Sequence, residues 1–148
     1  MTENPGQDDS PLIVAIDAAL HFTRKLGGFE FADSQIEPLS RIERLVVEYV
    51  RRFPGASPSE LGRELTLKGS NTSAVISGLV KKNQLRRESD PNDGRGTLLF
   101  LTEAGEDAVQ RVHREWEAVF SGIQVSDDQL KQAAATFELL FEALNPPN

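Results

Sequence analysis

Two observations predict a mainly α-helical fold with one small β hairpin, an α+β class, for this chain of 148 residues. Apolar residues recur at helical spacing in both the first and the last parts of the sequence. In one stretch, residues 85–101, that spacing gives way to two short extended segments around a turn. The length suits one domain or one two-lobed unit.

Six segments show the spacing of an amphipathic helix. They span residues 12–26, 42–53, 58–65, 68–82, 103–120 and 126–144. The second segment is the most regular, and its expected apolar face comprises Ile42, Leu45, Val46, Tyr49, Val50 and Phe53. The expected buried side of the fourth segment comprises Thr72, Val75, Ile76 and Leu79. Asn83 follows this segment and suits a left-handed helix end.

The hairpin is expected to have a long loop. Segments 85–88 and 97–101 flank residues 89–96, which contain one proline and two glycines. Together with the two helices before it, this hairpin makes a winged helix–turn–helix. The predicted organisation is an N-terminal arm and dimerisation helix in 1–38, the winged helix–turn–helix in 39–101, and C-terminal dimerisation helices in 102–148. The broad apolar faces of the outer helices favour a dimer interface.

Composition excludes several classes of function. The chain has no cysteine and two histidines, so disulfides, thiol chemistry and cysteine-based zinc sites are excluded. No catalytic residues, metal site or cofactor are predicted, and the chain is not expected to be an enzyme. It lacks a long apolar run and a signal-peptide pattern, which favours a cytoplasmic location. The net charge is −7, but residues 60–101 hold seven basic and five acidic residues, so this part alone is net basic and is where an anionic partner should bind.

A winged helix–turn–helix suits double-stranded DNA because the major groove of B-form DNA admits one α-helix. Asparagine can pair with adenine, serine with several base edges or with phosphate, and lysine with phosphate. Arg95, between two glycines at the tip of the hairpin, can enter a narrow minor groove, and Asp93 could hold its guanidinium in place. The expected DNA-contacting residues are Ser59, Ser70, Asn71, Ser73, Ala74, Ser77, Lys81, Lys82 and Arg95.

Residues 59–105 resemble the MarR family of bacterial winged-helix regulators without a gap. The resemblance is carried by Ser59-Glu60-Leu61, by Ser70-Asn71-Thr72-Ser73, and above all by the wing Asp90-Pro91-Asn92-Asp93-Gly94-Arg95-Gly96 followed by Leu101-Thr102-Glu103-Ala104-Gly105. Four positions depart from the family pattern. Lys68 stands where an N-capping residue is common, Ala74 where a basic residue is common, Gly78 lies within the helix, and Gln84 replaces an apolar residue.

The resemblance implies a homodimer whose two insertion helices read the half-sites of a pseudo-palindrome about one helical turn apart. It also implies a repressor that is released by a small aromatic or other anionic effector, which would bind between the dimerisation and DNA-binding parts. His21, Arg24 and Tyr49 could supply polar groups to such a pocket. The alternative is a winged-helix module that binds protein, which the acidic total and the few basic residues in 70–78 favour.

Overall fold

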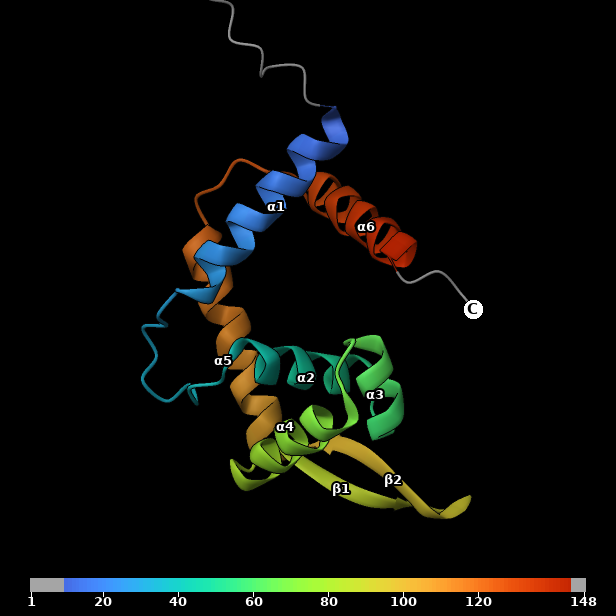
Figure 1. The fold of residues 1–148 in the computed structure, drawn as a ribbon. Helices are drawn as coiled ribbons and strands as arrows, with labels where there is room; N and C mark the ends of the chain where they lie inside the picture. The colour runs from blue at the N-terminus through green and yellow to red at the C-terminus, as the bar shows by residue number, and fades with distance from the viewer. Residues whose placement is uncertain (1–9, 145–148) are drawn as a thin grey trace, which may run out of the picture. The chain divides into compact units, whose positions relative to one another are not determined.

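The computed structural model describes residues 10–144, which form six α-helices and one two-stranded antiparallel sheet (Figure 1). The predicted α+β class is therefore confirmed, while the first part of the predicted N-terminal arm lies outside the described residues. None of the described helices is both long and apolar enough to cross a membrane. The elements are α1 (Pro11–Gly27), α2 (Arg41–Arg52), α3 (Pro58–Glu64), α4 (Gly69–Lys81), β1 (Leu85–Asp90), β2 (Asp93–Leu101), α5 (Glu103–Phe120) and α6 (Asp127–Leu144).

The chain divides into two compact units, and the division falls inside α5. The first unit extends to Glu115 and the second begins at Trp116. The first unit contains the hydrophobic core, which joins α2, α3, α4, the hairpin and the first half of α5. Its buried members are Val46, Val47, Val50, Leu61, Ile76, Leu79, Leu85, Leu99, Leu101 and Val109.

The buried face of α2 differs from the predicted one. Val46 and Val50 are buried as expected, and Val47 joins them, but Leu45 and Phe53 remain 48% and 49% exposed. The difference arises from tertiary contacts. Helix α2 contacts α3, α4 and β2, and it buries the side that faces these elements. In α4 the predicted face is confirmed, since Thr72, Ile76 and Leu79 are buried and Val75 is half-buried.

Two capping boxes fix where α2 and α3 begin. The Ser40 hydroxyl accepts from the amide of Glu43, and the Glu43 carboxylate accepts from the amide of Ser40. Ser57 and Glu60 make the same reciprocal pair at the start of α3. Each box satisfies two amides that a helix N-terminus otherwise leaves unpaired.

The strands of the hairpin are longer than predicted and their connection is shorter. Residues 89–96 were expected to form a loop, but the strands continue to Asp90 and restart at Asp93, with a bulge between Ser89 and Asp90. The Asp90 carboxylate accepts from the amide of Asn92 at 2.8 Å, which closes the turn. A Cβ at Gly96 would lie 2.8 Å from Asp90 Cβ, so this position needs glycine for the two strands to approach.

A short bridge attaches the hairpin to the segment between α2 and α3. The amide of Gly55 donates to the Leu99 carbonyl at 2.8 Å, and the amide of Leu99 donates to the Ala56 carbonyl at 3.0 Å. Gly55 adopts a φ of 85°, in the left-handed region that glycine tolerates best. This bridge fixes β2 beside the helix–turn–helix.

The junction between α4 and β1 contains a buried polar side chain. Asn83 has the predicted left-handed conformation, with a φ of 56°, and the following amide, of Gln84, donates to the Leu79 carbonyl. Gln84 is 5% exposed; its Nε2 donates to the Lys82 carbonyl at 3.3 Å. No described residue offers a hydrogen-bond donor to its Oε1. A buried acceptor without a donor lowers stability.

We expect Gln84→Met to raise the free energy of unfolding by about 1 kcal/mol, because it removes an unpaired buried acceptor and keeps an unbranched side chain of similar length. Urea unfolding at neutral pH measures the change. Gln132→Met, at an exposed position of α6, is the matched control and should change it little. A lower free energy of unfolding for Gln84→Met would show that the hydrogen bond from the Gln84 amide stabilises the fold by more than its unpaired oxygen destabilises it.

Candidate nucleic-acid interface

The exposed face of α4 presents small polar side chains. Thr72, Ile76 and Leu79 are buried and Val75 and Val80 pack partly against the core, so the opposite side of the helix faces outward. A Cβ at Gly62 would lie 2.9 Å from Thr72 Oγ1, so glycine there lets α3 approach α4 closely. The predicted contact residues Ser70, Asn71, Ser73, Ala74 and Ser77 are all exposed. Ser59 is also exposed, in the first turn of α3.

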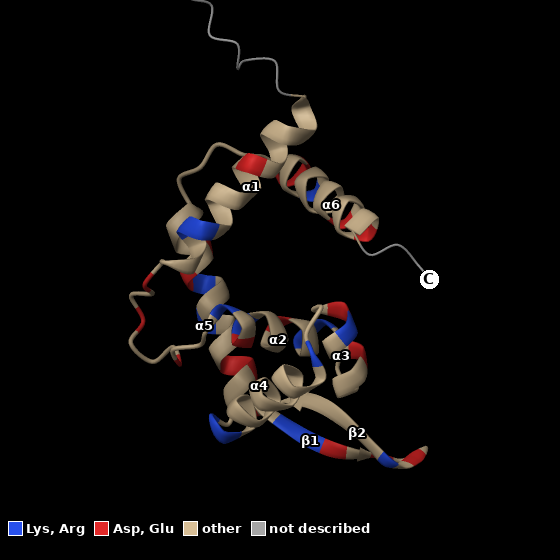
Figure 2. Ribbon diagram, viewed as in Figure 1, with Lys and Arg blue, Asp and Glu red and all other residues tan. Residues whose placement is uncertain are grey.

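At the wing, Asp93 holds the backbone of Arg95 rather than its guanidinium. The Asp93 carboxylate accepts from the amide of Arg95 at 3.1 Å. Within residues 10–144 the structure shows no ion pair between these two side chains, which differs from the orienting contact expected from the sequence. Arg95 is exposed, two positions after the first residue of β2. Figure 2 shows both basic and acidic segments at the far end of the hairpin. Asp93 therefore shapes the wing and leaves the Arg95 guanidinium available.

The two lysines at the end of α4 differ in their surroundings. Lys81 is exposed. Lys82 is half-buried, and its Nζ lies 2.9 Å from Glu43 Oε1 and donates to the Pro38 carbonyl at 3.2 Å. Lys82 thus ties the end of α4 to the start of α2, and a contact between Lys82 and phosphate would have to compete with that ion pair.

The Glu43 carboxyl takes part in both the capping box and this ion pair. Burial alone would raise its pKa, but hydrogen bonds from the Ser40 amide, Lys82 and the Ser40 hydroxyl outweigh burial, and the pKa lies below its ordinary value of 4.5. The folded state therefore favours the charged carboxylate.

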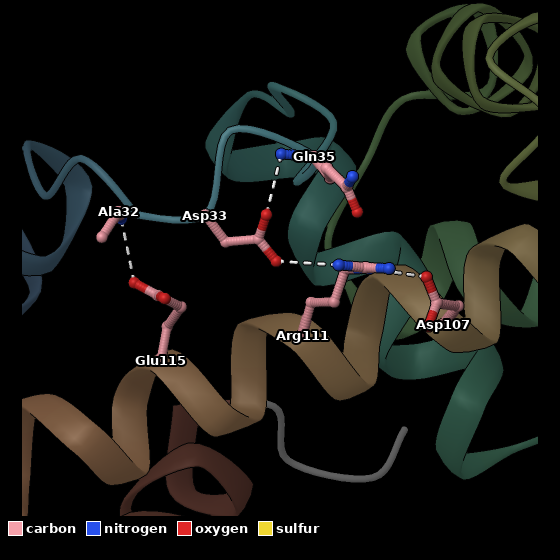
Figure 3. Close-up of polar contacts among 6 residues, drawn as sticks. All are labelled: Ala32, Asp33, Gln35, Asp107, Arg111 and Glu115. Atoms are coloured by element: carbon pink, nitrogen blue, oxygen red, sulfur yellow. Dashed lines mark hydrogen bonds and ion pairs between the residues drawn. The ribbon is translucent and has the colours of Figure 1, made fainter.

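A second polar cluster ties the loop between α1 and α2 to α5 (Figure 3). Arg111 Nη1 donates to Asp33 Oδ2 at 3.0 Å and Arg111 Nε donates to Asp107 Oδ2 at 2.6 Å. The amide of Ala32 donates to Glu115 Oε2 at 2.9 Å. The amide of Gln35 and then Arg111 hold the pKa of Asp33 below its ordinary value. The cluster fixes the loop to α5.

The three residues suggested for an effector pocket do not line one common cavity. Tyr49 lines a depression with Phe53 and Glu60, whereas His21 and Arg24 are exposed on α1 and line neither of the cavities described here. The other cavity, of about 320 Å³, lies between α2, the hairpin and α5. Its lining includes Val50, Arg51, Arg86, Phe100, Val109 and His113. His113 Nε2 lies 2.9 Å from Glu48 Oε1, which links α5 to α2.

Sequence reasoning missed Arg87. Its guanidinium Nη2 donates to Ser77 Oγ at 2.9 Å, so a residue of β1 reaches the exposed face of α4. The alternation of side chains along a strand carried a signal, but the partner could not be read from the sequence. In the part of the chain that the structure describes, no group of three or more His, Asp or Glu side chains is placed to hold a metal ion.

Comparison with known proteins agrees with the winged-helix fold described above. The model of the MarR family matches residues 38–96. No curated protein matches the chain. Among solved structures, the fold is similar to that of apo MarR from E. coli, with 21% identity, a TM-score of 0.60, and coverage of 94% of this chain and 100% of that one.

Two further structures share the fold with a bound molecule. The PcaV transcriptional regulator of Streptomyces coelicolor, in complex with its natural ligand, has 19% identity and a TM-score of 0.53, with coverage of 99% of this chain and 98% of that one. A mutant of S. aureus MepR bound to an oligodeoxyribonucleotide has 17% identity and a TM-score of 0.56, with coverage of 92% and 99%. The winged-helix fold expected from the sequence is thereby confirmed.

We expect Glu43→Gln to lower the free energy of unfolding at pH 7 by about 1 kcal/mol and to reduce its dependence on acid. Because the pKa of Glu43 is lowered by folding, its contribution is complete above 4.5 and is lost as the pH falls from 4.5 through the folded-state pKa. Urea unfolding between pH 7 and pH 3 measures both effects.

Glu64→Gln, at an exposed position of α3, serves as the control for this pH series. Equal acid dependence in the wild type, Glu64→Gln and Glu43→Gln would show that the negative charge of Glu43 adds nothing to stability.

Proposed function

We propose, from the MarR-family winged helix in residues 38–96, that this chain is a transcriptional regulator that binds double-stranded DNA in the cytoplasm. It acts as a homodimer on a pseudo-palindromic operator and represses transcription until an effector binds. The observation that carries the proposal is the position of an exposed, polar α4 beside a wing whose Arg95 is available.

The proposed contacts divide by the part of DNA that each can reach. Ser70, Asn71 and Ser73 on α4 face the major groove and read base edges, with Ala74 available for an apolar contact to a thymine methyl group. Ser59 and Lys81 contact phosphates and set the register of the helix. Arg95 enters the adjacent minor groove, where a narrow groove enhances the negative potential.

The homodimer is supported by apolar side chains that the single chain leaves exposed. Neither α1 nor α6 contains a buried residue. On α1 the exposed apolar residues include Leu12, Ile13, Val14, Ile16, Leu20 and Phe22; on α6 they are Leu130, Phe137, Leu139, Phe141 and Leu144. Uncovered apolar surface on this scale favours association, and a second copy of the chain is the partner that symmetry allows. We assign α1 and the helices after the wing to dimerisation.

The proposed effector is a small aromatic or anionic molecule. Of the residues suggested to recognise it, Tyr49 lines a depression of the first unit, whereas His21 and Arg24 lie outside that depression on α1. Support comes from PcaV, a structure of the same fold solved with its natural ligand. Such a molecule can release DNA only by binding one arrangement of the two insertion helices more tightly than the other.

Arg95→Ala is expected to weaken binding about tenfold or more and to make the salt dependence less steep. The DNA is a duplex selected by the wild type from genomic fragments, and fluorescence anisotropy across a salt series measures the affinity. Arg114→Ala, at an exposed position of α5, is the matched control. If the wild type selects no fragment and binds mixed DNA without a salt slope, the chain is instead a winged-helix module that binds protein.

The full chain is expected to sediment at twice its 16.3 kDa at micromolar concentration. Phe137→Asp places a charge on the exposed apolar face of α6 and should shift the mass towards the monomer, with weaker DNA binding. Gln132→Asp adds the same charge on the same helix at a polar, exposed position and should leave the dimer intact. A monomeric wild type would contradict the proposed dimer.

A further inference from the structure

Arg87 lies on the face of β1 that packs towards α4. In the antiparallel register Arg87 is opposite Leu99, which is fully buried, whereas its neighbour Arg86 is opposite Phe100. Successive side chains of a strand point to opposite faces, so the two arginines leave the hairpin on opposite sides. Arg86 lies over the Phe100 ring, 4.8 Å from its centroid, and pairs with Glu88.

From that inner face the Arg87 side chain reaches the outward surface of α4. Its Nη2 donates to Ser77 Oγ at 2.9 Å, and both residues are exposed. A guanidinium carries five N–H donors, and this hydrogen bond uses one of them. The remaining donors form a planar fork, which matches the oxygen atoms of a phosphate.

Helix α4 itself carries no basic residue from Gly69 to Val80. Its last residue, Lys81, is exposed, but the next lysine is occupied by Glu43 and the Pro38 carbonyl. Arg87 therefore supplies a positive charge beside the part of α4, from Gly69 to Val80, that has none of its own.

We propose that Arg87 contacts the DNA backbone and that Ser77 is its positioning residue. The proposal rests on the proposed DNA binding and refines it, because it removes Ser77 from the residues that read bases. The hydroxyl of Ser77 holds one edge of the guanidinium, which fixes the fork beside the helix that enters the groove. Since a phosphate contact carries no base information, the loss of Arg87 should weaken binding to all sequences alike.

The test compares Arg87→Gln with Arg86→Gln in the full chain. The probe is a mixed-sequence duplex of about 30 base pairs at low salt, because the phosphate contribution appears in non-specific binding as well. We expect Arg87→Gln to lose about tenfold in affinity and to reduce the slope of log K against log salt by about 1 for each protomer. Arg86→Gln removes the same charge from the other face of the hairpin and should change neither value.

Two further variants separate a DNA contact from a structural role. Arg87→Lys keeps the charge and should restore most of the salt slope, with an affinity between those of the wild type and Arg87→Gln. Ser77→Ala should cost a few-fold in affinity in the wild type and nothing in the Arg87→Gln background. A base-reading Ser77 would instead change the preferred sequence, and its effect would persist without Arg87.

The outcomes distinguish this inference from the function on which it rests. If the wild type binds duplex DNA with no salt slope, the proposed function fails. If the wild type binds with a steep slope and Arg87→Gln behaves as Arg86→Gln does, only the role of Arg87 is overturned. Equal thermal unfolding midpoints for the two variants show that any difference arises at the interface. If Arg87→Gln is unstable, the affinity of Arg87→Lys is the test instead: an affinity below that of the wild type supports the contact, and an unchanged affinity overturns it.

Discussion

Burial of the inner face of the hairpin against α4 is the interaction on which the candidate interface depends. Leu85 and Leu99 from the strands and Ile76 and Leu79 from α4 are at most 1% exposed. Each such side chain contributes about 1.5–3 kcal/mol by leaving water, whereas an exposed hydrogen bond contributes about 1 kcal/mol. The apolar contacts therefore set the distance between wing and helix, and the bond from Arg87 to Ser77 adjusts one side chain on a frame that is already fixed.

Features that depend on neighbouring residues could be predicted from the sequence. The buried face of α4 follows from residues three and four positions apart, and the left-handed Asn83 follows from its place at a helix end. The buried face of α2 could not be predicted fully, because Val47 is covered and Leu45 is left exposed by elements distant in the chain. The length of the two strands could not be predicted, for a local reason. The turn at Asp90 and the close approach at Gly96 let the strands continue through residues expected to form a loop.

The candidate site divides in the same way. Which residues of α4 face outward follows from which ones are buried, so the exposure of Asn71 and Ser73 could be anticipated. The roles of the basic residues could not, because their partners come from other elements. Lys82 is paired with Glu43, which is 39 positions earlier in the numbering, and Arg87 bonds to Ser77 across the junction of helix and strand. Charge in a sequence shows that a cation is present, while the fold decides whether it is available.

This distinction matters for a protein of net charge −7 that is proposed to bind DNA. The excess of basic residues in 60–101 is small, and the ion pairs of Lys82 with Glu43 and of Arg86 with Glu88 remove two cations from it. Non-specific affinity grows with the number of phosphates that cations neutralise, so a short set of available cations keeps it low. In the proposed complex, base contacts from α4 then contribute a larger share of the binding free energy. An acidic chain with few, well-placed cations can thus discriminate between sequences more sharply than a basic chain with the same base contacts.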